Sequence, residues 1–250
     1  MNAILLDIEG TTTPIAFVYD VLFPFARSHL REYVDDPRNR DALAEPLRRL
    51  NEEYEAEQDP ALAARRLEAS KLQARGESSQ RDAVLQRDGL VEYVEWLMDR
   101  DRKSPGLKLL QGQIWERGYR TGELRGQVFA DVPEALHRWH DAGLTVAIYS
   151  SGSELAQRLL FGSTASGDLT PLIARFFDTS VGPKTSPGSY STIAAQLDRR
   201  ARDVLFVSDV TTELNAASDA GMQTCLTVRP GNHPQPPHPH PVVESFDDIR

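Results

Sequence analysis

Cysteine is nearly absent from this sequence, with Cys225 as the only one among 250 residues. One cysteine cannot form a disulfide within the chain, and this usage fits a reducing compartment. The thiol lies in the apolar stretch TCLTV, which indicates a buried, unreactive side chain. Long apolar runs are absent too, since none approaches the roughly 20 residues that span a bilayer. The start of the chain lacks the features of a signal peptide, so we expect a cytoplasmic protein.

Basic residues are in deficit, with 28 Lys and Arg against 37 Asp and Glu, and a formal net charge of −9. Nucleic acids and anionic membranes bind basic surfaces, so we expect neither as a partner. A small anionic substrate remains compatible with this charge, because the local charges at a site decide its binding.

Strand and helix signals divide the chain into three stretches. Residues 1–20 begin with a buried strand, Ala3–Leu6, whereas residues 21–125 show helical periodicity and almost no strand signals. Residues 126–250 alternate strands with helices, which is typical of a parallel sheet covered on both faces. We therefore predict an α/β fold, with a doubly wound parallel-sheet core (1–20 and 126–250) and an inserted helical cap (21–125). Further strands are predicted at Leu144–Tyr149, Val204–Val207, Cys225–Val228 and within VVESFDDI, and cap helices at 43–58, 61–73, 90–100 and 107–119.

A biased segment, NHPQPPHPHP, holds three of the six histidines. One interpretation is a metal-binding tract. We favour the other, an extended surface loop that proline makes stiff.

Polar residues follow the carboxyl ends of the predicted core strands. Ligands of open α/β sheets bind beyond these ends, so the residues placed there are candidates for a site. Asp7 and Glu9 follow the first strand, in DIEGTTTP. The later strands and a Gly/Pro/Ser-rich loop between them add Ser150, Ser151, Lys184, Asp209 and Glu213.

These residue types suit phosphoryl transfer through a covalent aspartyl-phosphate on Asp7. A carboxylate and a phosphate charge repel by about 4 kcal/mol at about 4 Å, if the effective dielectric constant is about 20. A cation offsets this repulsion, and Lys184 is the candidate to neutralise the phosphate. Glu9 is placed to protonate the leaving oxygen and later to activate water.

Mg²⁺ is the divalent cation expected at such a site, because it prefers oxygen ligands and bridges carboxylates to phosphates. Asp7, Asp209 and the backbone carbonyl at Glu9 are its predicted ligands. The hydroxyls of Ser150 or Ser151 would hold the phosphate oxygens, together with backbone N–H groups of the helix that Ser153 caps.

Each signal alone has an ordinary explanation. An acid pair at a strand end can face water and cap a turn. A Ser-Ser-Gly sequence is usually a turn, and a loop lysine is usually solvated. The order of all these groups at consecutive strand ends is what favours a catalytic site.

The sequence resembles the phosphatases of the haloacid dehalogenase superfamily and, more closely, the enolase-phosphatase family of methionine salvage. The stretch DIEGTTTPIAFVYDVLFPFA is specific to that family, because most of the superfamily has Asp where Glu9 stands. The stretches YSSGSELAQRLLFG, GDLTPLIARFFDT, FVSDVTTEL and VRPGN continue the match in order. The likeness runs nearly from end to end of the chain.

This resemblance implies Asp7 as nucleophile, Glu9 as acid/base, and Ser150, Ser151 and Lys184 as substrate contacts. It implies one Mg²⁺ per subunit, bound at Asp7, Glu9 and Asp209, and a monomer. The implied reaction enolises 2,3-diketo-5-methylthiopentyl-1-phosphate and then removes its phosphate. Either Trp115 or Tyr119 of the cap would offer an apolar wall to the methylthio group, or both are core residues.

Three alternatives stay open from the residues. A different capped phosphatase would share the core residues but act on another phosphomonoester. A phospho-accepting receiver domain would also gather Asp, a hydroxyl and Lys, but it is about half this length and has no helical insert. A binding protein that lost its activity would lack catalytic groups, whereas all the matched positions are filled here.

Overall fold

The structure is a computed structural model that describes residues 1–60, 62 and 80–249. It divides into two compact units: Met1–Pro24 with Trp115–Arg250, and Phe25–Ile114. The domain limits expected from the sequence, after residue 20 and before residue 126, stay a prediction.

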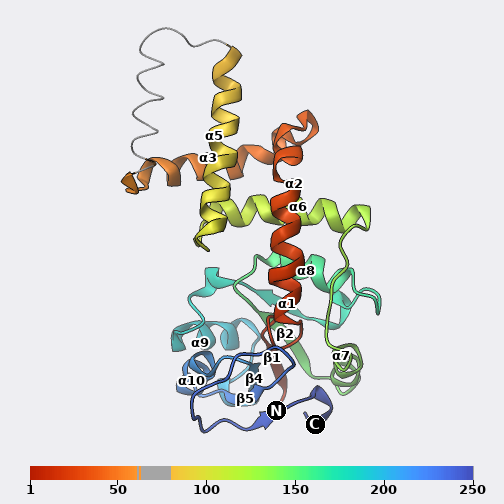
Figure 1. The fold of residues 1–250 in the computed structure, drawn as a ribbon. Helices are drawn as coiled ribbons and strands as arrows, with labels where there is room; N and C mark the ends of the chain where they lie inside the picture. The colour runs from red at the N-terminus through yellow and green to blue at the C-terminus, as the bar shows by residue number, and fades with distance from the viewer. Residues whose placement is uncertain (61, 63–79, 250) are drawn as a thin grey trace. The chain divides into compact units, whose positions relative to one another are not determined.

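The first unit is built around a six-stranded parallel sheet (Figure 1). The strand order is β3-β2-β1-β4-β5-β6, so the chain winds from the central β1 first toward one edge and then toward the other. This confirms the predicted doubly wound sheet. β3 is a strand that the sequence does not predict, because its three residues are too short a run and begin with an exposed arginine. The strands are β1 (Ala3–Leu6), β2 (Thr145–Tyr149), β3 (Arg175–Phe177), β4 (Val204–Ser208), β5 (Gln223–Thr227) and β6 (Val242–Val243).

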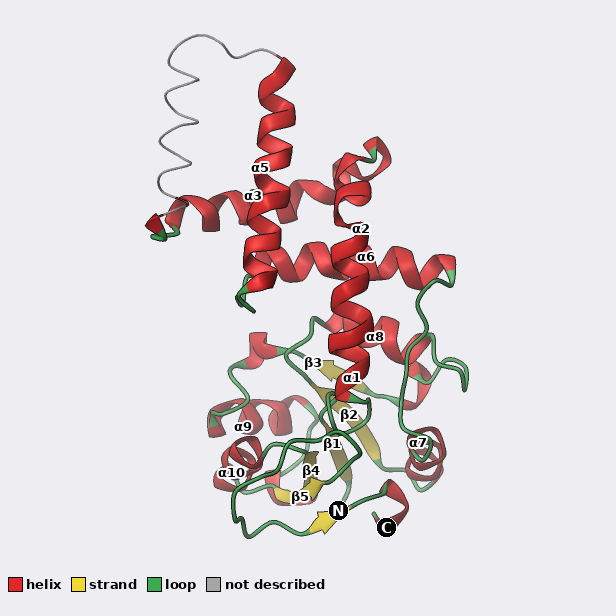
Figure 2. Ribbon diagram, viewed as in Figure 1, coloured by secondary structure: helices red, strands yellow, loops and turns green. Residues whose placement is uncertain are grey.

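Both faces of this sheet are covered by helices, as the apolar character of its strands requires. Leu5, Ala147 and Phe206 lie in one hydrophobic cluster with residues of α9 and α10. Residues that alternate with these along the strands face the other side, where α7 contacts β2 and α8 contacts β3 (Figure 2). The four helices are α7 (Val132–Asp141), α8 (Glu154–Gly162), α9 (Pro187–Gln196) and α10 (Thr211–Asp219).

Two residues outside the site have structural roles in this unit. Cys225 of β5 is buried, and burial raises the pKa of its thiol to about 11, as expected for an unreactive core cysteine. His240, in the biased segment, is buried, and its ring nitrogens lie 2.8 Å from Thr224 Oγ1 and 2.9 Å from Asn215 Oδ1. These bonds hold the segment against β5 and α10.

The second unit is helical. It contains α3 (Arg40–Ala56), α5 (Gln80–Asp99) and most of α2 (Phe23–Asp35) and α6 (Pro105–Thr121). Leu30, Leu50, Val94 and Leu110 are among its fully buried side chains. Before α2 the chain forms α1 (Ile15–Phe17) and a π-helical turn (Val18–Leu22).

The helices predicted at 43–58, 90–100 and 107–119 are confirmed, whereas the one at 61–73 lies outside the described residues except for residue 62. No helix within the described part of the chain is long and apolar enough to cross a membrane.

Candidate active site at the carboxyl edge of the sheet

The carboxyl ends of β1, β2 and β4 bring the predicted acids and hydroxyls to one edge of the sheet. Leu6, the last residue of β1, is in register with residues of both β2 and β4. The residues that come after these three strands are therefore neighbours. Asp7, Ser150 and Asp209 are only 4%, 3% and 6% exposed, so this is a desolvated site.

The loop after Asp7 is folded tightly on itself. Asp7 Oδ1 accepts a hydrogen bond from the N–H of Ile8 at 2.7 Å, and the N–H groups of Thr11–Thr13 all donate to the Ile8 carbonyl. The three threonine side chains are buried. Gly10 has φ +70°, and a Cβ there would lie 2.3 Å from Asp209 Oδ2. The loop thus passes directly against Asp209, at a distance that only glycine permits.

Lys184 enters this edge from the loop before α9 and lies between two carboxylates. Its Nζ is 2.6 Å from Asp7 Oδ1 and 2.7 Å from Glu213 Oε2. The lysine side chain is 11% exposed. The sequence predicts that this lysine joins the acids, and the structure brings them together.

Glu213 of α10 also belongs to this cluster. The sequence predicts it at this edge of the sheet but assigns it no role. Ser208 Oγ, at the end of β4, lies 3.1 Å from Glu213 Oε2 and 3.3 Å from Asp7 Oδ2. The position of Glu213 one helical turn after Asp209 is the signal that could have assigned it. Glu213 therefore helps to hold both Lys184 and Ser208.

Negative charge exceeds positive charge in the cluster. Burial and the charge of Asp7 raise the pKa of Asp209 to about 7, although Lys184 opposes this shift. Burial and Asp7 also raise the pKa of Glu213 to about 7, again against Lys184. Burial alone would lower the pKa of Lys184, but Asp7 and Glu213 raise it, so the ammonium stays charged. Lys184 thus offsets only part of the negative charge of Asp7, Asp209 and Glu213, and a further cation would relieve the remaining repulsion.

Ser150 begins the loop between β2 and α8. Its Oγ accepts a hydrogen bond from the N–H of Gly152 at 3.1 Å, and Ser151 is exposed. Ser153 caps α8 as predicted, because its Oγ accepts from the N–H of Ala156 at 3.3 Å. The loop therefore presents hydroxyls and the start of a helix at the same edge as Asp7.

The buried amide of Gln157 fixes this loop, and the sequence gives no sign of that role. It donates to the carbonyls of Gly152 at 2.9 Å and Phe177 at 2.8 Å. These two bonds join the loop to the end of β3.

Glu9 lies in the tight loop after Asp7 and is half-buried. Its charge contributes to the raised pKa of Asp209, after burial and the charge of Asp7. Across residues 1–60, 62 and 80–249, no group of three or more His, Cys, Asp or Glu side chains is arranged to hold a metal ion. The predicted magnesium site instead needs two carboxylates, Asp7 and Asp209, and one backbone carbonyl.

The two aromatic candidates for an apolar wall are packed into the protein. Trp115 is 7% exposed, and its indole N–H donates to the carbonyl of Leu22 at 2.8 Å. Its ring centroid is 6.2 Å from that of Phe23. The Tyr119 hydroxyl is buried, and burial raises its pKa. These contacts favour the interpretation of both as core residues.

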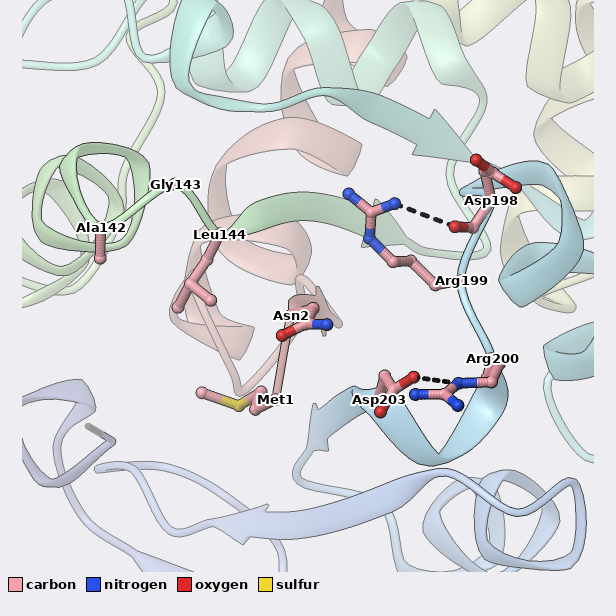
Figure 3. Close-up of a pocket in the computed structure, with 9 residues that line it drawn as sticks. All are labelled: Met1, Asn2, Ala142, Gly143, Leu144, Asp198, Arg199, Arg200 and Asp203. Atoms are coloured by element: carbon pink, nitrogen blue, oxygen red, sulfur yellow. Dashed lines mark hydrogen bonds and ion pairs between the residues drawn. The ribbon is translucent and has the colours of Figure 1, made fainter.

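A separate cavity of about 620 Å³ lies at the amino ends of β1, β2 and β4, the opposite edge of the sheet (Figure 3). Asn2, Leu144 and Asp203 line it, beside Arg199 and Arg200. Arg200 pairs with Asp203 at 2.6 Å, and Arg199 donates to Thr145 Oγ1 at 3.1 Å. The predicted catalytic residues are not among those that line this cavity.

The doubly wound sheet places the chain in the α/β class, and the aspartate, lysine and hydroxyls at its carboxyl edge are groups suited to phosphoryl transfer. A family model for the haloacid dehalogenase-like hydrolases matches residues 1–221, and the chain belongs to this family. Phosphatases of the family generally use Mg²⁺.

Relatives whose names give a specific activity within this family match nearly the whole chain. Enolase-phosphatase E1 of Synechococcus elongatus is 45% identical over 249 residues, which cover 100% of this chain and 98% of that protein. Enolase-phosphatase E1 of Pseudomonas fluorescens is 41% identical, with 100% and 97% covered. A probable bifunctional methylthioribulose-1-phosphate dehydratase/enolase-phosphatase E1 of Vitis vinifera is 42% identical over 99% of this chain and 47% of the plant protein.

Solved structures share the fold of this chain. The UTR4 protein of Saccharomyces cerevisiae has a TM-score of 0.74 and 32% identity, with 99% of both chains covered. A predicted phosphoglycolate phosphatase from Haemophilus somnus, at 16% identity and a TM-score of 0.55, shares the fold alone.

Proposed function

We propose that this chain is a bifunctional, Mg²⁺-dependent enolase-phosphatase of methionine salvage, an acireductone synthase. It converts 2,3-diketo-5-methylthiopentyl-1-phosphate to 1,2-dihydroxy-3-keto-5-methylthiopentene and phosphate. The observation that carries the proposal is the Asp7–Lys184 contact of 2.6 Å, at the carboxyl edge of the sheet, in a chain 45% identical to an enolase-phosphatase.

The phosphoryl step begins at Asp7. One carboxylate oxygen bonds to phosphorus while the bond from phosphorus to the C1 oxygen of the substrate breaks. Glu9 gives its proton to that leaving oxygen, then takes a proton from the water that attacks the aspartyl-phosphate. This attack releases phosphate and restores the Asp7 carboxylate. Lys184 and the hydroxyls of Ser150 and Ser151 hold the phosphate oxygens throughout.

Asp7, Asp209 and the backbone carbonyl of Glu9 would hold one Mg²⁺ per subunit. The excess of buried carboxylates over lysine supports this assignment, because the site then needs a further cation. When bound, the ion neutralises phosphate charge and polarises a carbonyl oxygen of the substrate as a Lewis acid.

Enolisation requires a base that takes a proton from C1 of the diketone. Glu9 is our candidate, because it lies two residues from the nucleophile and its side chain is one methylene longer than that of Asp. If Glu9→Ala enolises the substrate at the wild-type rate, another group is the base.

The decisive experiment follows enol absorbance and phosphate release together on the diketo-phosphate, with Mg²⁺ or with EDTA. We expect enol to rise first, phosphate to follow, and both to be lost with EDTA. Asp7→Asn should stop phosphate release. Turnover of generic phosphomonoesters without activity on the diketone would mean a different capped phosphatase, and stoichiometric phosphate uptake without turnover would mean a receiver.

We also propose a monomer in the cytoplasm whose partner is this small phosphorylated diketone, without nucleic acid or membrane. Sedimentation of the purified protein tests the oligomeric state.

A further inference from the structure

We propose that Tyr149, Ser189 and Tyr190 are positioning residues that hold the Lys184 ammonium in place by fixing the backbone of its loop. We call these residues the hydroxyl clamp. The inference rests on the proposed function, because it assigns roles within the same site. Each hydroxyl donates to one of three consecutive carbonyls: Tyr149 Oη to Gly182 at 2.8 Å, Ser189 Oγ to Pro183 at 2.8 Å, and Tyr190 Oη to Lys184 at 2.7 Å.

The Lys184 loop depends on such side-chain donors because of its own sequence. Pro183 and Pro187 have no backbone N–H to donate. Gly182 has φ +127°, and a Cβ there would lie 2.3 Å from Ser189 Oγ. The clamp therefore sits directly against the backbone that carries the lysine.

The donors themselves belong to the rigid core. Tyr149 ends β2 and Tyr190 lies in α9, and both are fully buried. Their rings meet edge to face at 5.6 Å and 83°, and the Tyr190 ring lies 5.0 Å from that of Phe206 in β4. The Lys184 Nζ is also 5.8 Å from the centroid of the Tyr149 ring. The backbone of the Lys184 loop is thus held by side chains of β2 and α9, which pack against β4.

The short contacts of the Lys184 ammonium explain why its loop would need the hydroxyl clamp. Contacts of 2.6 Å to Asp7 and 2.7 Å to Glu213 tolerate only small displacements of Nζ. A lysine stem is long and flexible, so its backbone must be held if the ammonium is to be preorganised. If these hydroxyls had only a structural role, removing them would lower the free energy of unfolding but would not change the contribution of Lys184 to kcat/KM.

The test removes one hydroxyl at a time from the full chain, with Tyr149→Phe, Ser189→Ala and Tyr190→Phe, in wild-type and Lys184→Ala backgrounds. The readouts are kcat and KM on the diketo-phosphate and on p-nitrophenyl phosphate, and the unfolding midpoint in urea. In the wild-type background we expect kcat/KM to fall about 3- to 10-fold per hydroxyl, the loss of about one hydrogen bond. In the Lys184→Ala background we expect no further fall, because the clamp acts through this lysine.

Equal losses of kcat/KM in both backgrounds would contradict the proposal that the hydroxyls act through Lys184. A lower unfolding midpoint with unchanged kcat/KM would contradict it too. Ser163→Ala is the matched control, since it removes a hydroxyl that donates to a backbone carbonyl, that of Leu159 at 2.5 Å, outside the site. If the diketo-phosphate is not turned over, the proposed function fails. The p-nitrophenyl phosphate series then still decides the clamp.

Discussion

Gly10 is the residue whose replacement tests the close approach of the catalytic loop to Asp209. An alanine Cβ would lie 2.3 Å from Asp209 Oδ2, so Gly10→Ala should displace that carboxylate and lower kcat at least about tenfold, a barrier increase of about 1.4 kcal/mol. Gly122 is the matched control. Its φ is +77°, and apart from its two chain neighbours no described residue has an atom within 4 Å of an added Cβ. Both variants should lose about 1–2 kcal/mol of stability in urea, but Gly122→Ala should keep its activity. Equal activities would show that the loop tolerates a side chain.

Glu213 tests the second anchor of Lys184. Glu213→Gln keeps the shape of the side chain but removes the charge that lies 2.7 Å from Nζ. We expect kcat/KM for phosphate release to fall about tenfold, or about 1.4 kcal/mol. Glu154→Gln is the control, because this glutamate pairs with the exposed Arg158 rather than with a residue of the cluster. Wild-type kinetics for Glu213→Gln would mean that Asp7 alone positions the lysine.

A buried ion pair joins several elements of the first unit. Arg229 Nη1 lies 2.8 Å from Asp131 Oδ2 and donates to the carbonyl of Glu244 at 2.8 Å. Its Nε donates to the carbonyl of Thr11 at 3.3 Å, in the loop that carries the catalytic acids. One side chain therefore ties the chain after β5 to the catalytic loop, the start of α7 and the C-terminal segment.

Breaking this pair should destabilise the fold more than breaking a surface pair. Asp131→Asn leaves the buried guanidinium without its counter-charge, which costs about 3–5 kcal/mol in such pairs. Glu116→Gln, at the exposed pair with Arg120, should change the urea midpoint little. A loss for Asp131→Asn no larger than for Glu116→Gln would contradict this role.

The pair also gives stability a pH dependence with a defined sign. Burial opposes ionisation of Asp131, but the N–H of Phe246 and Arg229 hold its pKa below the usual value. This contribution is therefore complete above about pH 4 and is lost as the pH falls through the lowered pKa of the folded state. In acid, wild type and Asp131→Asn should converge in stability.

Across the whole molecule, strand order is predictable from the sequence, whereas packing between distant segments is not. Asp7, Ser150 and Asp209 are predictable, because each comes after a buried strand and parallel strands end at one edge. The sequence also places Lys184 and Glu213 among the candidates, but the contact between them and the positioning of Lys184 by Tyr190 cannot be read from it. Those contacts arise because α9 and α10 pack side by side on the sheet. Contacts that depend on such packing produce no periodic pattern in the local sequence. β3 escapes prediction for a simpler reason, since three residues are too few to show alternation.

The charge excess of the site makes the stability of the whole chain depend on Mg²⁺. One lysine offsets part of the charge of Asp7, Asp209 and Glu213, so a divalent cation that binds only the folded state should stabilise it. At a concentration about 100 times Kd the gain is about 2.7 kcal/mol, or a rise in Tm of about 5–10 °C for a chain of this size. We expect this rise in the wild type with MgCl₂, its reversal by EDTA, and its absence in Asp209→Asn, as measured by scanning calorimetry. Asp219→Asn, on the exposed end of α10, should respond as the wild type does. A Tm that Mg²⁺ leaves unchanged in the wild type, or that rises equally in Asp209→Asn, would remove Asp209 from the metal site.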